Sequence, residues 1–313
     1  MRIGMIGLGK MGANMSERLL RGGHDVVAFD LSPEARQAVA SKGAASAATL
    51  AEFVALLPAP RAAWVMVPAG EATNSTIDDL SEHFAAGDVI VDGGNSNYKE
   101  AIEIAARLSK KGIGFVDAGT SGGVWGLTEG YCLMVGGTKE SVAAVEPAFL
   151  TLAPEGGYSH VGPVGAGHFV KMVHNGIEYG LMQAYAEGFE IMSAAGEFSL
   201  DLHEIASIWC YGSVVRSWLL ELAERALRPD AGFEGIRGVV VDSGEGRWTA
   251  QEAVERGVPA PVILTSLFTR FASQHEDSFQ LKLLSALRNQ FGGHAVTLES
   301  GQQGLETGTP APG

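Results

Sequence analysis

The feature that most constrains the fold is a glycine-rich loop close to the N-terminus. Gly7, Gly9 and Gly12 form the pattern GxGxxG directly after the apolar run Arg2–Ile6. In such a loop the first glycine makes a tight turn, the second lets the backbone approach a pyrophosphate, and the third allows a helix to pack closely on a strand. The helix expected next, Gly12–Arg21, presents free N–H groups to phosphates. The pattern therefore predicts a strand, a dinucleotide-binding loop and a helix.

A carboxylate stands at the end of the next expected strand, Asp25–Asp30. Asp30 lies roughly 20 residues beyond the loop, where an acid binds the adenosine ribose hydroxyls and repels a 2′-phosphate. Leu31 and Ser32 supply no cation to offset that charge, and Arg36 is expected to face solvent. We therefore predict NAD rather than NADP, and a helix N-cap is the other role open to Asp30. The cofactor contacts expected here are Gly7, Leu8, Gly9, Met11, Gly12, Asp30 and Val67.

The first half of the chain alternates short β-branched runs with amphipathic stretches, which is typical of strands that alternate with helices. The expected strands are Arg2–Ile6, Asp25–Asp30, Ala63–Val67, Val89–Asp92, Gly114–Asp117 and Tyr131–Val135. Ser32 and Pro33 predict the start of a helix, because serine is a good N-cap and proline suits the first turn. This alternation predicts the α/β class, with a Rossmann-type doubly wound parallel sheet.

After the glycine-rich segment Val161–Gly167 the pattern becomes helical. His168–Ala194 contains no proline and is expected to form one long helix. Further helices are expected at Leu202–Tyr211, Ser213–Leu227, Thr249–Glu255, Pro261–Ser273 and Ser278–Gln290. We therefore expect a dinucleotide-binding domain over residues 1–164, an all-helical C-terminal domain over residues 165–299, and a flexible polar tail over residues 300–313.

Charge and cysteine content restrict the expected partners and location. The formal net charge is -14, so neither nucleic acid nor an anionic membrane is an expected partner. The chain shows no signal peptide and no apolar run long enough to span a bilayer. Its two cysteines, Cys132 and Cys210, stand in apolar surroundings and in no metal-binding pattern. We expect two buried thiols, no metal site and a cytoplasmic location.

A stripe of polar side chains marks the long helix. At about 100° per residue, Lys171, His174, Asn175 and Glu178 fall within about one-third of the helix circumference, with Tyr179 at the edge. The stripe is either a solvated face or a catalytic one. A lysine becomes a good base only if burial or neighbouring cations lower its pKa, as the cleft beside a dinucleotide can do.

These segments together resemble 6-phosphogluconate dehydrogenase, and most of all its shorter, NAD-preferring bacterial branch. The resemblance extends to about Val296. The motifs that carry it are Gly7–Gly12, Val91–Ser96, Asp117–Gly123, Lys171–Tyr179, Arg247–Ala250 and Arg288–His294. It implies oxidative decarboxylation of 6-phosphogluconate to ribulose 5-phosphate and CO2 with reduction of NAD, in a homodimer or homotetramer whose helical domain binds the substrate and dimerises.

The resemblance also implies a role for each matching residue. Lys171 matches the general base, and Glu178 matches the acid that protonates the enediol. Substrate or nicotinamide contacts are implied for Asn95, Ser121, Gly122, Gly123, His174 and Asn175. Tyr179 and Arg270 match phosphate ligands, and Arg288 and His294 match residues that reach into a neighbouring subunit's site. A short tail leaves open whether the last two act in their own subunit or in the neighbour.

Two other functions remain open from the sequence. One is another β-hydroxyacid dehydrogenase of the same architecture, acting on a small unphosphorylated acid such as 3-hydroxyisobutyrate. Such an enzyme would have no use for Arg270, Arg288 and His294 around a phosphate. The other is a dinucleotide-binding sensor without turnover, which would keep the glycine loop but would not need Lys171 and Glu178 on one face.

Overall fold

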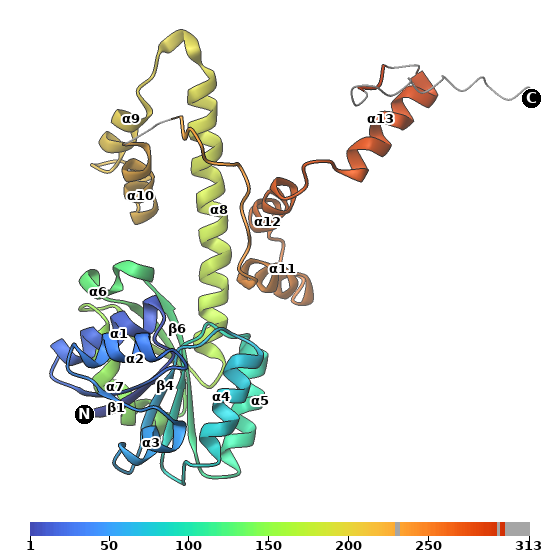
Figure 1. Ribbon diagram of the computed structural model, residues 1–313. Coiled ribbons are helices and arrows are strands. Elements are labelled where there is room, and N and C mark those ends of the chain that lie inside the picture. Colours follow the sequence, from blue (N-terminus) through green and yellow to red (C-terminus); the bar gives the residue numbers. More distant parts are fainter. Residues whose placement is uncertain (229–231, 293–294, 298–313) are drawn as a thin grey trace, which may run out of the picture. The chain divides into compact units, whose positions relative to one another are not determined.

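The structure, a computed structural model, describes residues 1–228, 232–292 and 295–297. Figure 1 shows the chain, which divides into two compact units. The first comprises Met1–Met182 and Gly244–Ile263, and the second comprises the described residues of Gln183–Ser243 and Leu264–Gly313. Because one long helix contributes to both units, they do not follow the expected boundary between residues 164 and 165, which stays a prediction.

The first unit is built on a sheet of eight strands in the order β3-β2-β1-β4-β5-β6-β7-β8. The strands are β1 (Arg2–Ile6), β2 (Asp25–Phe29), β3 (Ala45–Ser46), β4 (Ala62–Val65), β5 (Val89–Asp92), β6 (Gly114–Ser121), β7 (Cys132–Gly137) and β8 (Tyr158–Gly162). The six strands expected from the sequence are all present, with β1 and β5 at the expected bounds. The Rossmann-type sheet is thus confirmed, and β3 and β8 extend it.

One pair of strands departs from the expected parallel arrangement. β6 and β7 pair antiparallel, from Val116 opposite Gly137 to Ser121 opposite Cys132, whereas the other pairs among the described strands are parallel. A parallel crossover needs about a dozen residues or more. The link between β6 and β7 holds only η1 (Gly123–Trp125) and the short helix α6 (Gly126–Glu129), so the chain turns back instead.

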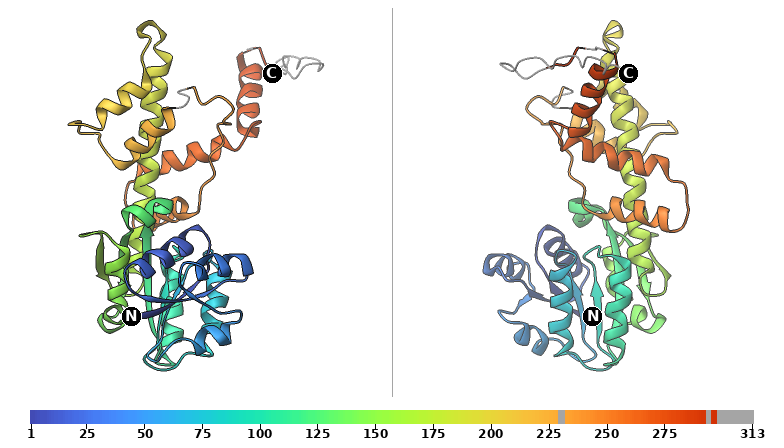
Figure 2. Two further views of the ribbon diagram at one scale, coloured as in Figure 1. Left: turned by 60° about the vertical axis from the view of Figure 1, so that its left-hand side comes forward. Right: turned by 90° about the vertical axis from the view of Figure 1, so that its right-hand side faces the viewer.

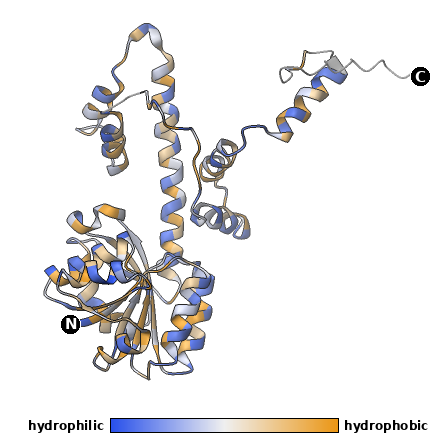
Figure 3. Ribbon diagram, in the orientation of Figure 1, coloured by the Kyte–Doolittle hydropathy of each residue, from blue (hydrophilic) through white to orange (hydrophobic). Residues whose placement is uncertain are grey.

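The sheet is apolar on both faces, which explains why its strands appear in the sequence as nearly continuous apolar runs. Along β4, Trp64 belongs to the hydrophobic cluster on one face, and Ala63 and Val65 belong to the cluster on the other. Figure 3 shows mainly hydrophobic colours on the strands. The edge of the Trp64 ring packs on Phe149, with ring centroids 5.5 Å apart.

Helices cover both faces of this sheet (Figures 1 and 2). Residues of α1 (Lys10–Arg21), α2 (Pro33–Ala40) and α7 (Lys139–Leu152) join the cluster on one face. Residues of α3 (Leu50–Ala55), α4 (Glu71–Ser81) and α5 (Tyr98–Ser109) join the cluster on the other. Burial of both faces by crossover helices holds the strand ends, and therefore the loops that follow them, in fixed positions.

The long helix α8 (Ala166–Ala194) begins two residues before the expected start at His168. The helices that follow are α9 (Leu202–Trp209), α10 (Trp218–Leu227), α11 (Glu245–Glu255), α12 (Pro261–Ser273) and α13 (Phe279–Gly292), with a 3-10 turn at Gly196–Phe198. α10 starts later than the expected Ser213, because the Ser217 side chain caps it by accepting from the Leu220 N–H. In the second unit, Leu202, Ala206, Leu220 and Leu227 form a small core.

Among the described residues, no helix is both long enough and apolar enough to cross a membrane.

Candidate active site

A cavity of about 860 Å³ lies in the first unit, lined by residues at the carboxyl ends of β1, β2, β4 and β5. Its volume is within the range of small-molecule sites. Most of the predicted cofactor residues line it, namely Gly7, Gly9, Met11, Gly12, Asp30, Val67 and Asn95. The remaining one, Leu8, is buried, with only 5% of its surface exposed.

The three glycines of the loop meet different constraints. Gly7 has φ +89°, and a Cβ there would lie 2.4 Å from Met66 O. A Cβ on Gly12 would lie 1.9 Å from Gly7 O, whereas a Cβ on Gly9 would meet nothing within 4 Å. No described side chain caps α1 at Gly9. The fold itself thus requires Gly7 and Gly12, while the open space at Gly9 and the uncapped helix end fit a pyrophosphate.

Asp30 holds the glycine loop against the end of β2. Its Oδ2 accepts from the Leu8 N–H at 2.7 Å, and its Oδ1 accepts from the Ser32 N–H at 2.8 Å. The N-cap of α2 is Ser32, whose Oγ accepts from the Ala35 N–H at 3.1 Å. The alternative that Asp30 caps this helix is therefore wrong, because the serine hydroxyl already fills the position.

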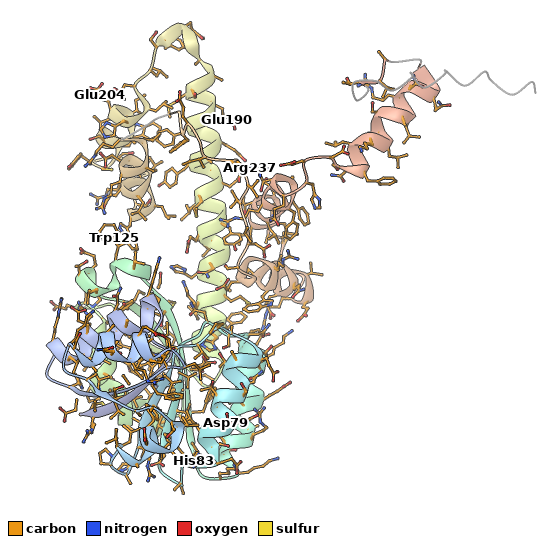
Figure 4. All side chains as sticks on the ribbon, in the orientation of Figure 1. Asp79, His83, Trp125, Glu190, Glu204 and Arg237 are labelled. Carbon is orange, nitrogen blue, oxygen red and sulfur yellow. The ribbon has the colours of Figure 1, made fainter. Side chains whose placement is uncertain are left out.

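Arg36 does not extend into solvent as expected. It is half-buried, and its Nη1 donates to Asp30 O at 2.7 Å and to Leu31 O at 3.3 Å. The guanidinium turns back because the carbonyl oxygens of Asp30 and Leu31, directly after β2, lie within its reach. A second carboxylate, Asp79 on α4, also lines the cavity (Figure 4).

The predicted polar stripe on α8 forms one connected cluster at the end of β6. Lys171 Nζ lies 2.7 Å from Asn175 Oδ1 and 3.4 Å from His174 Nδ1. His174 Nε2 lies 3.5 Å from Ser121 Oγ. On the next turn, Glu178 Oε2 lies 3.8 Å from His174 Nδ1. The stripe is therefore not a solvated face over its whole length, because Lys171 is only 5% exposed and Asn175 only 9%.

Burial tunes the amine at the centre of this cluster. Desolvation lowers the pKa of Lys171 below its ordinary value, while the negative charges of Glu178 and Glu245 act in the opposite direction. Loss of hydration outweighs these attractions because the amine is enclosed, and water no longer stabilises its charged form. Burial thus favours the neutral form of the Lys171 amine, which can act as a base, and Glu178 supplies a carboxyl group about two turns further along α8.

Helix α11 packs against the turns of α8 that carry the cluster. Thr249 Oγ1 donates to Met172 O at 2.7 Å, and a Cβ on Gly176 would lie 2.6 Å from the Thr249 side chain. A Cβ on Gly246 would lie 2.4 Å from the ring of Tyr179, which is 5% exposed. Glycine at these two positions lets the helices approach and gives Tyr179 its place beside α11.

The ends of β5 and β6 are joined by one side chain. Asn95 Nδ2 donates to Thr120 O at 3.4 Å, and the Thr120 N–H donates to Asn95 Oδ1 at 3.1 Å. Directly after Ser121, Gly122 (φ +129°) and Gly123 (φ +53°) turn the chain away from β6. Asn95 and Ser121 thus stand at neighbouring strand ends, with Asn95 at the cavity and Ser121 at the lysine cluster.

Two family models match the chain over most of its length. Residues 2–162 match the NAD binding domain of 6-phosphogluconate dehydrogenase, and residues 167–282 match its C-terminal domain. The chain belongs to the 6-phosphogluconate dehydrogenase family. The expected decarboxylating dehydrogenase is thereby confirmed at the level of the family.

Relatives of similar length share nearly half of the residues. A putative 6-phosphogluconate dehydrogenase, YqeC, of Bacillus subtilis is 45% identical over 296 residues, which span 95% of this chain and 99% of the relative. An NAD(+)-dependent, decarboxylating 6-phosphogluconate dehydrogenase of Haloferax volcanii is 46% identical over 299 residues, which span 95% and 98%. The expected short branch of the family is thus confirmed.

A solved structure supports the same fold. The 6-phosphogluconate dehydrogenase of Plasmodium falciparum superposes with a TM-score of 0.81 at 28% identity, over 97% of this chain and 67% of that one. The structure of that protein was determined with its cofactor NADP+ and with its substrate 6-phosphogluconate.

The predicted phosphate ligands beyond Tyr179 belong to the second unit. Arg270 lies on α12 and donates from Nη1 to Val241 O at 3.3 Å. Arg288 lies on α13 and is exposed. His294 falls outside the described residues. The phosphate-binding roles of these three residues stay predictions.

The expectation of two buried thiols is wrong. Cys132 is exposed, Cys210 is partly exposed, and both are free. Cys132 opens β7 opposite Ser121, where the strand leaves the cover of the core, so an apolar neighbourhood in the sequence does not enclose it. Its thiol lies close enough to Lys171 to influence the pKa of that amine.

Sequence reasoning missed a residue beneath the cluster. Asp117 lies inside the motif Asp117–Gly123 but has no role among the residues predicted for the site. It is fully buried, and its two oxygens accept backbone N–H groups at the start of α8. A carboxylate within the apolar run of an expected strand was the available signal, because such a group needs partners. Among the described residues, no group of three potential ligands could hold a metal ion.

The glycine loop gives a test of the cofactor site that does not depend on turnover. We expect Gly9→Ala to leave the Tm of the cofactor-free protein within about 2 °C while weakening NAD binding at least about tenfold, since its Cβ would meet only the ligand. Gly12→Ala is the control, and it should lower the Tm because its Cβ would collide with Gly7 O. Calorimetry measures both quantities, and unchanged NAD affinity in Gly9→Ala would contradict the assignment of the loop.

Proposed function

We propose that this chain catalyses the oxidative decarboxylation of 6-phosphogluconate to ribulose 5-phosphate and CO2, with reduction of NAD. The observation that carries the proposal is the buried Lys171 amine, which shares hydrogen-bond contacts with Asn175 and His174 beside the end of β6. The dinucleotide-type cavity belongs to the same compact unit, and membership of the family supplies the reaction.

Lys171 is proposed to act first as a base. Bound NAD supplies the acceptor for the hydride that leaves C3 of the substrate. The neutral amine of Lys171 takes the proton from the 3-hydroxyl as that hydride departs, which produces a 3-keto acid and a protonated lysine. The lowered pKa makes the neutral amine available, and the Asn175 carbonyl oxygen fixes its position.

Decarboxylation then requires an electron sink. The C3 carbonyl is that sink, because the Lys171 ammonium can protonate its oxygen. The bond between C1 and C2 breaks and CO2 leaves. The electron pair of that bond moves toward the C3 oxygen, which takes back the proton from Lys171. Glu178 protonates the carbon of the resulting enediol, and Lys171 removes the hydroxyl proton, so that the ketone of ribulose 5-phosphate forms. Glu178 is suited to this because its side chain is 38% exposed and can regain a proton from solvent.

Substrate binding is assigned to the residues that match the contacts of the family. Ser121, Gly122 and Gly123 are proposed to bind the substrate carboxylate, while Asn95, His174 and Asn175 are proposed to orient the hydroxyls and the nicotinamide. Tyr179, Arg270, Arg288 and His294 are the proposed phosphate ligands. Arginine suits a terminal phosphate because its planar guanidinium binds two oxygens at once.

NAD is proposed over NADP because the cavity carries two acids. Asp30 and Asp79 both line it, and Asp30 is held in place by two backbone N–H groups. A 2′-phosphate near these carboxylates would be repelled. Arg36 lies close by, but its Nη1 already donates to the carbonyl oxygens of Asp30 and Leu31.

Assembly and location are proposed from the family and from the cysteines. We propose a homodimer or homotetramer, with Arg288 and His294 acting in either their own or a neighbouring subunit. Two free cysteines accord with a reducing compartment such as the cytoplasm.

One assay tests the function against its alternatives. Purified protein with 6-phosphogluconate and NAD should produce reduced cofactor and CO2 in equal amounts, measured by absorbance and by CO2 capture. 3-Hydroxyisobutyrate should give no rate above background. Cofactor reduction without CO2 would overturn decarboxylation, and no reduction with any hydroxyacid would favour a dinucleotide sensor.

Lys171→Met should lower kcat by at least about 1000-fold while the Kd for NAD stays unchanged, because a general base contributes that order of rate. In the unaltered protein, kcat/KM should fall as pH decreases through the lowered pKa of Lys171, because the base must be neutral. Lys139→Met, at an exposed position on α7, is the matched control and should behave as the unaltered protein does. A parallel loss of NAD affinity in Lys171→Met would remove support for the base.

Asp30→Asn should lower the ratio of kcat/KM for NAD to kcat/KM for NADP by about tenfold, which corresponds to about 1.4 kcal/mol of lost repulsion. The ratio is the informative quantity, because loss of a contact to the glycine loop affects both cofactors alike. Asp25→Asn, at the exposed opposite end of β2, should leave the ratio unchanged. An unchanged ratio in Asp30→Asn would contradict the assignment to the ribose.

A further inference from the structure

The start of α8 lies in direct backbone contact with two strands. A Cβ on Gly167, in the first turn of the helix, would lie 2.3 Å from Asp117 O and 2.5 Å from Met134 O. A Cβ on Gly136 of β7 would lie 2.8 Å from Gly167 N, and one on Gly119 of β6 would lie 2.7 Å from Gly167 O. We call these three residues, Gly119, Gly136 and Gly167, the glycine contact.

The same contact sets the position of the catalytic lysine. A Cβ on Gly119 would lie 2.5 Å from the Cβ of Lys171, so the root of the lysine side chain rests on the backbone of β6. Ser121, two residues further along β6, meets His174 of the cluster. The height of α8 above β6 therefore decides where the Lys171 amine lies relative to the strand end.

One buried carboxylate fastens the helix to this position. Asp117 Oδ1 accepts from the Gly165 N–H at 2.7 Å, and Oδ2 accepts from the His168 N–H at 2.9 Å. The Gly165 N–H lies directly before α8 and the His168 N–H lies in its first turn, where N–H groups have no acceptor within the helix. The Asp117 side chain on β6 thus caps the start of α8, although Gly165 and His168 lie 48 and 51 residues further along the chain. The helix dipole favours a negative charge at this end.

Backbone and the His168 side chain enclose this carboxylate. Asp117 is 0% exposed, and a Cβ on Gly136 would lie 2.5 Å from its Oδ1, so no larger residue fits opposite. His168 makes a second link, since its Nε2 lies 3.2 Å from the carbonyl oxygen of Asp92 on β5. Burial raises the pKa of Asp117, and the charge of His168 and the two N–H groups oppose that rise.

We propose that Asp117 is a positioning residue for the proposed reaction, which holds the first turn of α8 on the glycine contact and thereby keeps the Lys171 amine buried beside Asn175. The inference rests on the proposed function of Lys171 as the base. Asp117 itself touches no reacting atom and acts through the helix backbone. It is distinct from a general stabilising cap because its loss changes the environment of one particular amine.

Asp117→Asn tests the proposal with little change of shape. The amide keeps one acceptor but turns an N–H group toward the second backbone donor, so one side of the first turn is released. We expect kcat/KM to fall by about 100-fold with the Kd for NAD unchanged, because small misplacements of a reacting group carry costs of that order. The acidic limb of the pH profile should move to higher pH, since a less buried Lys171 has a pKa closer to its ordinary value.

Asp88→Asn is the matched control. Asp88 is 2% exposed, and its carboxylate also accepts two backbone N–H groups, from Arg61 and from Ala85, but it precedes β5 at the opposite end of the sheet. Both variants should have a lower Tm than the unaltered protein, whereas only Asp117→Asn should change the pH profile of kcat/KM. Equal shifts in the two profiles, or no shift in either, would overturn the proposal.

A labelling experiment separates this proposal from the proposed function. Acetic anhydride reacts with neutral amines, so at a pH above the ordinary pKa of lysine every lysine is neutral and the labelling rate, measured by mass spectrometry, reports how accessible each amine is. Lys171 should be labelled several-fold faster in Asp117→Asn than in the unaltered protein, whether or not 6-phosphogluconate is turned over. Gly119→Ala should also speed the labelling of Lys171. Gly114→Ala is the control on the same strand, β6, because its Cβ would be equally crowded, at 2.5 Å from Ser141 Oγ of α7, and it should leave the rate at Lys171 unchanged. An unchanged rate at Lys171 in a folded Asp117→Asn would refute the positioning role.

Discussion

Parallel pairing of β1, β2, β4, β5 and β6 brings their carboxyl ends to one edge of the sheet, and the site depends on that arrangement. The glycine loop follows β1, Asp30 follows β2, and Asn95 follows β5. The chain runs outward from β1 to β3 and then crosses back to β4 on the other side of β1, and the cavity opens at this switch point of the strand order. Each cofactor-facing residue owes its place to a strand whose two faces are both buried.

The lysine cluster extends this edge with a helix. α8 brings Lys171, His174 and Asn175 to the end of β6, and the antiparallel return of β7 supplies the second strand beneath its first turn. Glycine at Gly119, Gly136 and Gly167 permits the close approach of α8 to β6 and β7. The buried carboxylate of Asp117 accepts the free N–H groups at the start of the helix. The same enclosure that fixes the lysine also removes its water, which lowers its pKa.

Much of the architecture was predictable because local signals agreed with the fold. The runs at β1 and β5 carry a single charged residue each, at one end, and the expected bounds hold. The capping of α2 by Ser32 followed from its sequence signal. The direction of β7 did not, because strand polarity depends on the length and path of the connection. The burial of Cys132 was wrongly expected, since apolar neighbours in sequence do not determine which side of a strand is covered.

The sequence by itself determined a dinucleotide-type loop, an acid after the second strand and four polar residues on one helical face, because these follow from short spacings and helical periodicity. Tertiary structure alone decided that Asp30 braces the loop, that Arg36 turns back, and that Asp117 caps a helix far along the chain. The contacts of Asp30 with Leu8 and of Asp117 with Gly165 join residues remote in sequence, and the removal of water on burial strengthens them. The spacing from Lys171 to Glu178 could therefore be read from the sequence, but the lowered pKa of Lys171 could not.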